Sequence, residues 1–566
     1  MNDHLYQQQR HHLLNHPLFS WPGLGVWSFY FLLKIGAGVF GYIELNLLWN
    51  IVLFFFLVIP IQPRSLKIAR QLIAIIAAVI LFYQETSLPP FSRLVDQWQL
   101  VSSFSVVYLV ELIGRFIAIE AIAVFLVAMI VFAYLRKIIR MTALTLVLLV
   151  IYPVLPQFAP APIYTSPSAQ VTSAPMLAIQ RGSGDPDAIL TRFYAQQSQI
   201  RLSPPSVANP NFDILILNVC SLSWQDLQQF DLLDHPLWAQ ADIMLSNFYT
   251  GSSYSGPATL RLLQASCGHV PHRQLFEPEG ECMMNEQLAA LGFAAEIRMN
   301  HSGAFDNFLR QIRELGGMQD AQVVSPEQFP IAMSGFDQAP IRADSAIFTD
   351  WLDTLGATPK FTFYNTMSLH DGNRLSGFRG NSMASYRTRA KTLLDDTLQL
   401  FQDIEASGRN VLVVMVPEHG SGLQGDRMQL PGMREIPTPE LTHVPVLFKL
   451  FGEGVAGAGL DVAGSAGMGA AGSSAESAGM GAAGSGTRAH ELVQIGHATG
   501  PSAIAEVIYE IIRQQPFTGG SYRPAEIAGA VNETLPVLEN DRVIMLNVEG
   551  QFLLQINNGE WRPYNR

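Results

Sequence analysis

Five apolar stretches before residue 160 constrain the fold of this 566-residue chain more than any other feature. They are Val26–Ile43, Leu47–Ile61, Ile68–Tyr83, Ile117–Leu135 and Met141–Phe158. A helix that spans a bilayer needs about 20 mostly apolar residues, so the second and third stretches are short. Hydrophobic residues make up 49% of the chain and charged residues 14%, which suits a membrane protein. We expect residues 1–158 to form an α-helical membrane domain with about five transmembrane helices; buried helices of a soluble core are the alternative.

Basic residues predict the orientation of this domain, because cytoplasmic loops of membrane proteins carry an excess of Lys and Arg. Arg64, Lys67 and Arg70 separate the second stretch from the third. Arg136, Lys137 and Arg140 separate the fourth stretch from the fifth. With both loops in the cytoplasm, five spans place the N-terminus inside and the chain after residue 160 outside. Arg115 and Glu120 border the fourth stretch. We interpret residues 104–115 as an interfacial helix that keeps its charge in contact with water.

Residues 159–210 are rich in Pro, Ser, Ala and Thr, a composition typical of a tether, with a short helix expected around Asp187–Gln197. Residues 211–566 alternate apolar strands with amphipathic helices. The expected strands are Asp213–Val219, Ala294–Met299, Thr362–Thr366, Val411–Val416 and Val444–Phe451, and the expected helices include Ser345–Leu355 and Tyr386–Ser407. This alternation predicts an α/β domain around a central, mostly parallel sheet.

One segment departs from this alternation. The nine residues Ser465–Ser473 recur unchanged as Ser477–Ser485. Gly and Ala bury too little surface to offset their ordering entropy, so residues 453–488 are predicted to be a disordered Gly/Ala/Ser-rich insertion. The net charge of −12 argues against nucleic acid as a partner, since a phosphate backbone calls for a basic face.

Metal-ligand side chains follow three of the expected strands. Cys220 comes after the first strand, Glu418 and His419 follow Val411–Val416, and His370 follows Thr362–Thr366. Parallel sheets place ligands beyond the carboxyl ends of their strands, so these side chains are expected to converge. Thiolate, carboxylate and imidazole are zinc ligands. A lone cysteine at a strand end is usually a small buried hydrophobic residue. A metal role for Cys220 is favoured only because the other candidate ligands are expected to lie beside it.

Ser255 precedes Gly256 and Pro257, and proline in a first helical turn marks a helix start. We expect Ser255 to be the N-cap of a helix over Pro257–Leu263, where backbone N–H groups favour a bound anion. Beside metal ligands, this hydroxyl is a candidate nucleophile; an ordinary capping serine is the alternative. Arg427 lies near the Glu418 loop and is a candidate phosphate contact. His370 could carry a proton to or from a reacting oxygen.

The three cysteines have separate explanations. Cys267 and Cys282 are fifteen residues apart in a segment dense with Gly, Pro and His. In an oxidising compartment they could close a disulfide. Such a bridge would contribute about 3 kcal/mol by the loop-entropy model. Cys220 is then left unpaired.

Six spaced motifs resemble the cellulose phosphoethanolamine transferases of bacterial cellulose secretion systems. This family lies in the membrane phosphoethanolamine transferase branch of the alkaline-phosphatase/sulfatase superfamily. The motifs are Asn218–Trp224, Ser253–Pro257, Arg261–Gly268, Phe363–Thr366, Leu369–Asn373 and Val416–Gly420. Most of the wider superfamily has a carboxylate in place of Cys220 and a threonine in place of Ser255, and the cellulose branch resembles this chain in having cysteine and serine.

The resemblance implies a set of site residues. Cys220, Ser255, Glu418 and His419 would surround one Zn²⁺ ion, Cys267 and Cys282 would form a structural disulfide, and Tyr254, His370 and Arg427 would line the substrate pocket. It also implies a multi-pass protein of the bacterial inner membrane with its catalytic domain in the periplasm.

The resemblance implies a two-step phosphotransfer. Ser255 would take phosphoethanolamine from phosphatidylethanolamine and pass it to a hydroxyl of cellulose, with His370 as the acid/base and cellulose synthase subunits as partners. Two alternatives stay open: a different acceptor, such as lipid A or another envelope glycan, and a non-catalytic scaffold of a secretion complex.

Overall fold

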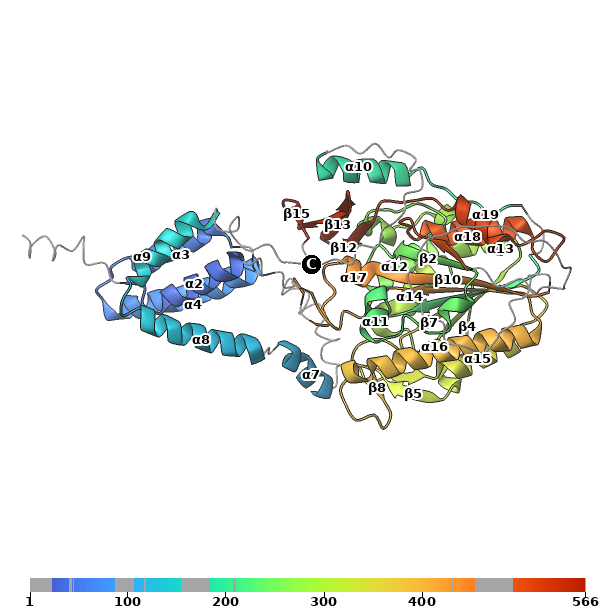
Figure 1. The fold of residues 1–566 in the computed structure, drawn as a ribbon, viewed down its shortest axis with the longest axis horizontal. Helices are drawn as coiled ribbons and strands as arrows, with labels where there is room; N and C mark the ends of the chain where they lie inside the picture. Colours follow the sequence, from blue (N-terminus) through green and yellow to red (C-terminus); the bar gives the residue numbers. More distant parts are fainter. Residues whose placement is uncertain are drawn as a thin grey trace, which may run out of the picture. The chain divides into compact units, whose positions relative to one another are not determined.

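The computed structural model describes residues 23–39, 43, 45–86, 106–116, 119–153, 184–206, 210–426, 428–429, 431–453 and 492–564. Two compact units make up the chain (Figure 1). The first comprises residues 1–101 and 112–177, and the second comprises residues 102–111 and 178–566. Most of the predicted tether, Arg427 and the predicted insertion apart from Glu453 lie outside the described residues.

Helices occupy all five apolar stretches of the first unit. They are α2 (Trp27–Val39), α3 (Leu47–Val58), α4 (Arg64–Glu85), α8 (Ile119–Leu135) and α9 (Met141–Ile151). Among the described helices, only α4 is long and apolar enough to cross a membrane, with 22 residues. The expectation of five spans is therefore not confirmed by helix length. Arg64, Lys67 and Arg70 belong to α4 and not to a loop, because the helix begins directly after Pro63.

A mixed eight-stranded sheet is the centre of the second unit (Figure 1). In spatial order its strands are β11 (Val493–Ile495), β2 (Ile243–Tyr249), β10 (His443–Phe451), β9 (Val411–Pro417), β1 (Asp213–Val219), β7 (Lys360–Thr366), β3 (Ala294–Met299) and β4 (Gln322–Val323). Both pairings of β10 are antiparallel, and the other five pairings are parallel. The α/β prediction is confirmed.

Helices cover both faces of the sheet, and the two hydrophobic cores follow from the alternation of side chains along each strand. On β1, Ile214 and Ile216 face one core, while Leu215 and Leu217 face the other. The first core is closed by α12 (Ser255–Leu263), α13 (Met284–Ala290), α14 (Phe308–Leu315), α18 (Ser502–Gln514) and α19 (Pro524–Ala530). The second is closed by α11 (Trp224–Gln229), α15 (Asp344–Asp353) and α16 (Ser382–Ser407).

Smaller elements surround this core. One antiparallel sheet contains the four strands β12 (Val537–Asn540), β13 (Val543–Val548), β14 (Gln551–Ile556) and β15 (Arg562–Pro563). A second antiparallel sheet contains the three strands β5 (Ile331–Ser334), β6 (Pro340–Arg342) and β8 (Arg374–Leu375). The remaining helices are α7 (Val106–Phe116), α10 (Pro186–Gln197) and α17 (Pro439–Thr442). Leu190 and Phe193 of α10 pack with Val537 and Leu546, so packed structure begins before residue 211.

Candidate metal centre and nucleophile

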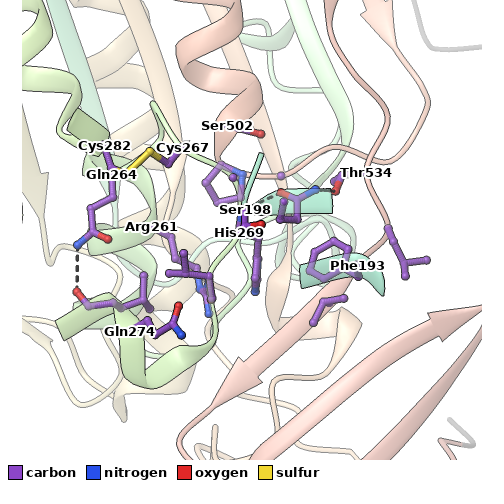
Figure 2. A pocket seen from close by; sticks show the side chains of 18 of the residues that line it. Phe193, Ser198, Arg261, Gln264, Cys267, His269, Gln274, Cys282, Ser502 and Thr534 are labelled. Atoms are coloured by element: carbon purple, nitrogen blue, oxygen red, sulfur yellow. Dashed lines mark hydrogen bonds between the residues drawn. A yellow bond between two sulfur atoms is a disulfide. The ribbon is translucent and has the colours of Figure 1, made fainter. Parts of the chain in front are cut away.

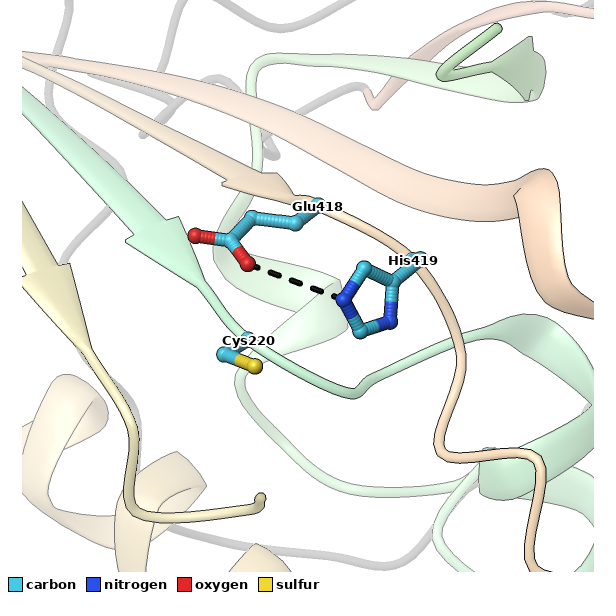
Figure 3. A group of neighbouring side chains, drawn as sticks. All are labelled: Cys220, Glu418 and His419. Carbon is cyan, nitrogen blue, oxygen red and sulfur yellow. Dashed lines mark ion pairs between the residues drawn. The ribbon is translucent and has the colours of Figure 1, made fainter. Parts of the chain in front are cut away.

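Three potential metal ligands meet at the carboxyl ends of β1 and β9. These strands are parallel neighbours that pair Val219 with Pro417, so the residues that follow them lie side by side. Cys220, Glu418 and His419 are at most 2% exposed. Their ligand atoms all lie within 4.8 Å of one another (Figure 3). This cluster can hold a metal ion.

The imidazole of His419 is oriented for ligation. Its Nδ1 lies 2.8 Å from the carbonyl oxygen of Gly420, which can only accept a hydrogen bond. The proton is therefore on Nδ1, and the lone pair of Nε2 faces the cluster. Burial and the positive charge of Arg434 lower the pKa of His419 well below its usual range, so the ring is neutral, as a metal ligand must be.

Glu418 has one oxygen that the protein satisfies and one that it does not. Oε1 accepts hydrogen bonds from Asn365 Nδ2 at 2.5 Å and from Thr259 Oγ1 at 3.4 Å. Oε2 is buried and has no hydrogen-bond donor among the described residues. Burial raises the pKa of this carboxyl. A buried carboxylate oxygen without a donor is costly unless a cation neutralises it, and this fits a metal ligand.

The Cys220 thiol leads to the same conclusion. Burial raises its pKa to about 12, and the negative charge of Glu418 contributes in the same direction. A thiol in this position stays protonated unless a cation stabilises the thiolate, and bound zinc deprotonates coordinating thiols. The donor set of one sulfur, one carboxylate and one imidazole therefore fits zinc.

Ser255 brings a hydroxyl to this cluster. Its Oγ lies 3.2 Å from His419 Nε2 and 3.7 Å from Cys220 Sγ. The prediction that Ser255 is the N-cap is wrong, because Tyr254 is the N-cap of α12. The helix begins at Ser255, two residues before the expected start at Pro257. The hydroxyl still lies in the first turn, where backbone N–H groups have no helical acceptor and favour an anion.

His370 reaches the cluster through Arg434. Its Nδ1 faces the carbonyl oxygen of Asp371 at 2.7 Å, and its Nε2 lies 3.3 Å from Arg434 Nη2. Arg434 Nη1 in turn lies 3.2 Å from His419 Nε2. Burial and the Arg434 charge lower the pKa of His370 to about 3, so the ring is neutral at neutral pH.

The other two predicted pocket residues have different outcomes. Tyr254 is 36% exposed, and its hydroxyl donates to Glu435 Oε2 at 2.8 Å. Arg427 lies outside the described residues. Sequence reasoning missed Arg434 and Asn365, which contact the candidate ligands directly. Asn365 could have been proposed from the sequence, because it is a polar residue near the end of an expected strand. In the structure it lies in register with Asn218 of β1.

The second unit also contains a cavity of about 340 Å³ that is lined by Arg261 and by the Cys267–Cys282 disulfide (Figure 2). None of the cluster residues lines it. His269, which lines this cavity, contacts the buried carboxylate of Glu539. That carboxylate accepts hydrogen bonds from Tyr194 Oη at 2.5 Å, His269 Nε2 at 3.0 Å and the His272 backbone N–H at 2.8 Å. Burial alone would raise the pKa of Glu539, but His269 and the charge of Arg261 lower it to about 2.

Comparisons with known proteins match nearly the whole chain. The model of the "Cellulose biosynthesis protein BcsG N-terminal domain" matches residues 27–154, and that of the C-terminal domain matches residues 170–466. The chain is 33% identical to cellulose biosynthesis protein BcsG of Escherichia coli K12 over 96% of this chain and 97% of that protein. Its identity to the Salmonella typhimurium LT2 protein of that name is 34%, over 97% and 98%.

Among solved structures, a Vibrio parahaemolyticus protein in the alkaline phosphatase superfamily has 12% identity over 68% of this chain and 88% of that chain, with a TM-score of 0.45. The assignment rests on the sequence matches, which define a class of two-domain bacterial cellulose-biosynthesis proteins. Within that class, the chain belongs to the BcsG family.

Proposed function

We propose that the chain is a zinc-dependent transferase that moves phosphoethanolamine from phosphatidylethanolamine to hydroxyl groups of secreted cellulose. One observation carries the proposal: the Ser255 hydroxyl lies 3.2 Å from His419 Nε2 and 3.7 Å from Cys220 Sγ. A nucleophile in contact with a metal-binding cluster is the arrangement of a metal-assisted phosphotransferase. The family and the six resembling motifs support the donor and the acceptor.

Cys220, Glu418, His419 and Ser255 would hold the ion. When bound, zinc would supply a Lewis acid that lowers the pKa of the Ser255 hydroxyl and offsets charge on the phosphoryl oxygens. Asn365 holds Oε1 of Glu418 and leaves Oε2 directed into the cluster. The Gly420 carbonyl fixes the ring of His419. These two contacts orient the ligands before an ion arrives.

The chain's own residues then account for two displacements. Ser255 Oγ attacks the phosphorus of the lipid, the bond to the diacylglycerol oxygen breaks, and that oxygen takes a proton. A cellulose hydroxyl next attacks the serine ester, loses its proton and restores Ser255. His370, whose Nε2 lies beside Arg434, is the group proposed to carry the proton from the Ser255 hydroxyl to the leaving oxygen and from the cellulose hydroxyl back to Ser255. Arg434 lies between the two histidines, and its guanidinium would bind the phosphoryl oxygens of the substrate.

We propose a multi-pass protein of the inner membrane with its second unit in the periplasm and subunits of the cellulose synthase complex as partners. The helix α4 meets the length of a span, and four shorter apolar helices accompany it. Such an anchor would keep the site near its lipid donor and near the polymer as it is secreted. The disulfide fits an oxidising compartment.

Intact mass spectrometry of the full chain in detergent with phosphatidylethanolamine tests the chemistry. We expect a phosphoethanolamine adduct that maps to Ser255 and is absent from Ser255→Ala. Ser255→Thr keeps a hydroxyl and should retain part of the reaction. If the wild-type protein binds zinc and the lipid but forms no adduct, the transferase proposal is wrong and the scaffold alternative gains support. Transfer to lipid A and not to cellulose would instead reassign the acceptor.

A further inference from the structure

The first half of α7 has two faces with opposite character. Residues 102–111 belong to the second unit, the unit that contains the metal cluster. Tyr108 is 7% exposed, while Val106, Val107 and Val110 are 75%, 59% and 64% exposed. The valines lie at spacings of one and four residues, so they share one side of the helix, and Tyr108 and Glu111 lie three apart on the other. An apolar face is thus directed away from the domain.

Tyr108 contacts the loop that carries His370. Its hydroxyl lies 3.3 Å from Asp371 Oδ2. The backbone of Gly372 has φ +83°, and a Cβ at this residue would lie 2.8 Å from the Tyr108 ring. Glycine is therefore required there by conformation and by the close approach of the tyrosine. The helix and the loop fit together at a residue adjacent to Asp371 and two residues after His370.

Glu111 extends the contact to α16. Its side chain is 7% exposed and accepts hydrogen bonds from Arg374 Nη2 at 3.0 Å and from Ser382 Oγ at 2.7 Å. The same Ser382 oxygen lies 2.8 Å from Asp371 Oδ1. One carboxylate of α7 thus joins the end of the His370 loop to the start of α16.

These contacts continue to the reacting groups. The Tyr108 ring packs on Phe336 at 6.4 Å between centroids, and Phe336 stacks on His370 at 4.5 Å. His370 contacts Arg434 as described above. A shift of α7 would therefore move the imidazole, because packed side chains transmit displacements of their neighbours.

We propose that the valine face of α7 lies on the surface of a phospholipid bilayer, and that Tyr108 and Glu111 position His370 relative to that surface. A lipid surface is the occupant that the sequence favours. The chain continues from α7 into α8, an apolar helix whose side chains are largely exposed, Val124 and Ile130 by 69% and 67%. The functional half of the inference rests on the proposed transfer from phosphatidylethanolamine; the lipid contact does not.

Quenching in proteoliposomes tests the lipid contact without any activity. The full chain carries an environment-sensitive fluorophore at Val107→Cys or, as the control, at Val323→Cys, since Val323 is also an exposed valine of the second unit. Lipids with a quencher near the headgroup should quench the Val107 probe and leave the Val323 probe unchanged. Equal quenching at the two positions, or none at Val107, would overturn the proposal.

Two donors separate positioning at the bilayer from general damage. Replacing Val107 and Val110 by Glu should raise KM about tenfold for phosphatidylethanolamine embedded in vesicles. The same variant should leave the rate with a water-soluble short-chain phosphatidylethanolamine unchanged. Val323→Glu should change neither. If the transfer rate falls equally with both donors, the valines have only a structural role. If it changes with neither donor, the valine face of α7 does not contact the bilayer.

The positioning residues have their own outcome. Tyr108→Phe and Glu111→Gln should lower kcat with both donors while the zinc content stays that of the wild type, and Glu111→Asp should restore part of the rate. Wild-type kcat in both variants would remove Tyr108 and Glu111 from the account. If the wild-type protein transfers nothing to Ser255, the proposed function fails, and the quenching result still decides the lipid contact.

Discussion

Glu418 and Glu539 are both buried carboxylates in the second unit, at 2% and 3% exposure, yet their surroundings differ. Both oxygens of Glu539 accept hydrogen bonds, from Tyr194, His269 and the His272 backbone. Glu418 has donors for one oxygen and, among the described residues, none for the other. The protein lowers the pKa of Glu539 to about 2 and raises that of Glu418.

The difference separates a structural charge from a functional one. Arg261 and three donors stabilise the ionised form of Glu539, so this carboxylate needs no ligand. Glu418 stands beside a buried thiol whose pKa is also raised. A site that the protein leaves electrostatically incomplete is poised for a cation. Paired substitutions of the two glutamates test this distinction.

The largest expected effect is on transfer. Glu418→Gln removes a charged ligand, and we expect phosphoethanolamine transfer to fall on the order of 10³-fold, which corresponds to several kcal/mol of lost stabilisation by the ion. Glu539→Gln should stay within about tenfold of wild type per folded molecule, because its contacts lie away from the cluster. Single-turnover adduct formation on Ser255 measures both. Equal losses in the two variants would erase the proposed difference.

The effect on stability should be reversed. Glu539→Gln leaves the buried Arg261 without its compensating charge and should destabilise the fold by about 4 kcal/mol. Glu418→Gln, measured in a chelator, should cost less than about 1 kcal/mol, because it removes a buried charge that lacks a full set of partners. Denaturant unfolding of the full chain in detergent gives both values. A larger loss for Glu418→Gln would contradict the account.

The smallest effect is a pH dependence. The folded pKa of Glu539 is about 2, below the ordinary value of 4.5, so its ionised form favours folding above pH 4.5 and this contribution is lost as the pH falls toward 2. The contribution is about 3 kcal/mol. The difference in unfolding free energy between wild type and Glu539→Gln should therefore shrink from pH 6 to pH 3. A constant difference over this range would show that the charge of Glu539 does not stabilise the fold.

The central strands were predictable because their burial is uniform. Every residue of β1 and β9 is buried, and each strand contains an unbroken apolar run of four or more residues. The bounds of β1 and β3 agree with the prediction. The strand β2 was missed because Ser246 and Asn247 interrupt its apolar run. The direction of β10 could not be predicted, since an apolar run has the same composition in either direction.

The candidate site was predictable only where its residues follow strands. Cys220, Glu418 and His419 converge because β1 and β9 are parallel neighbours. Arg434 comes from a loop without periodicity, and its approach to His419 depends on the path of that loop. The contacts of Tyr108 and Glu111 join residues more than 260 positions apart, which no local pattern can indicate.

Metal content of purified full-length protein tests the central claim most directly. Elemental analysis should find about one zinc ion per chain in the wild type and in Glu539→Gln, and far less in Glu418→Gln. That result would establish Glu418 as a ligand and Glu539 as a structural charge. Zinc absent from the wild type under metal-replete conditions, or equal in all three proteins, would contradict the account.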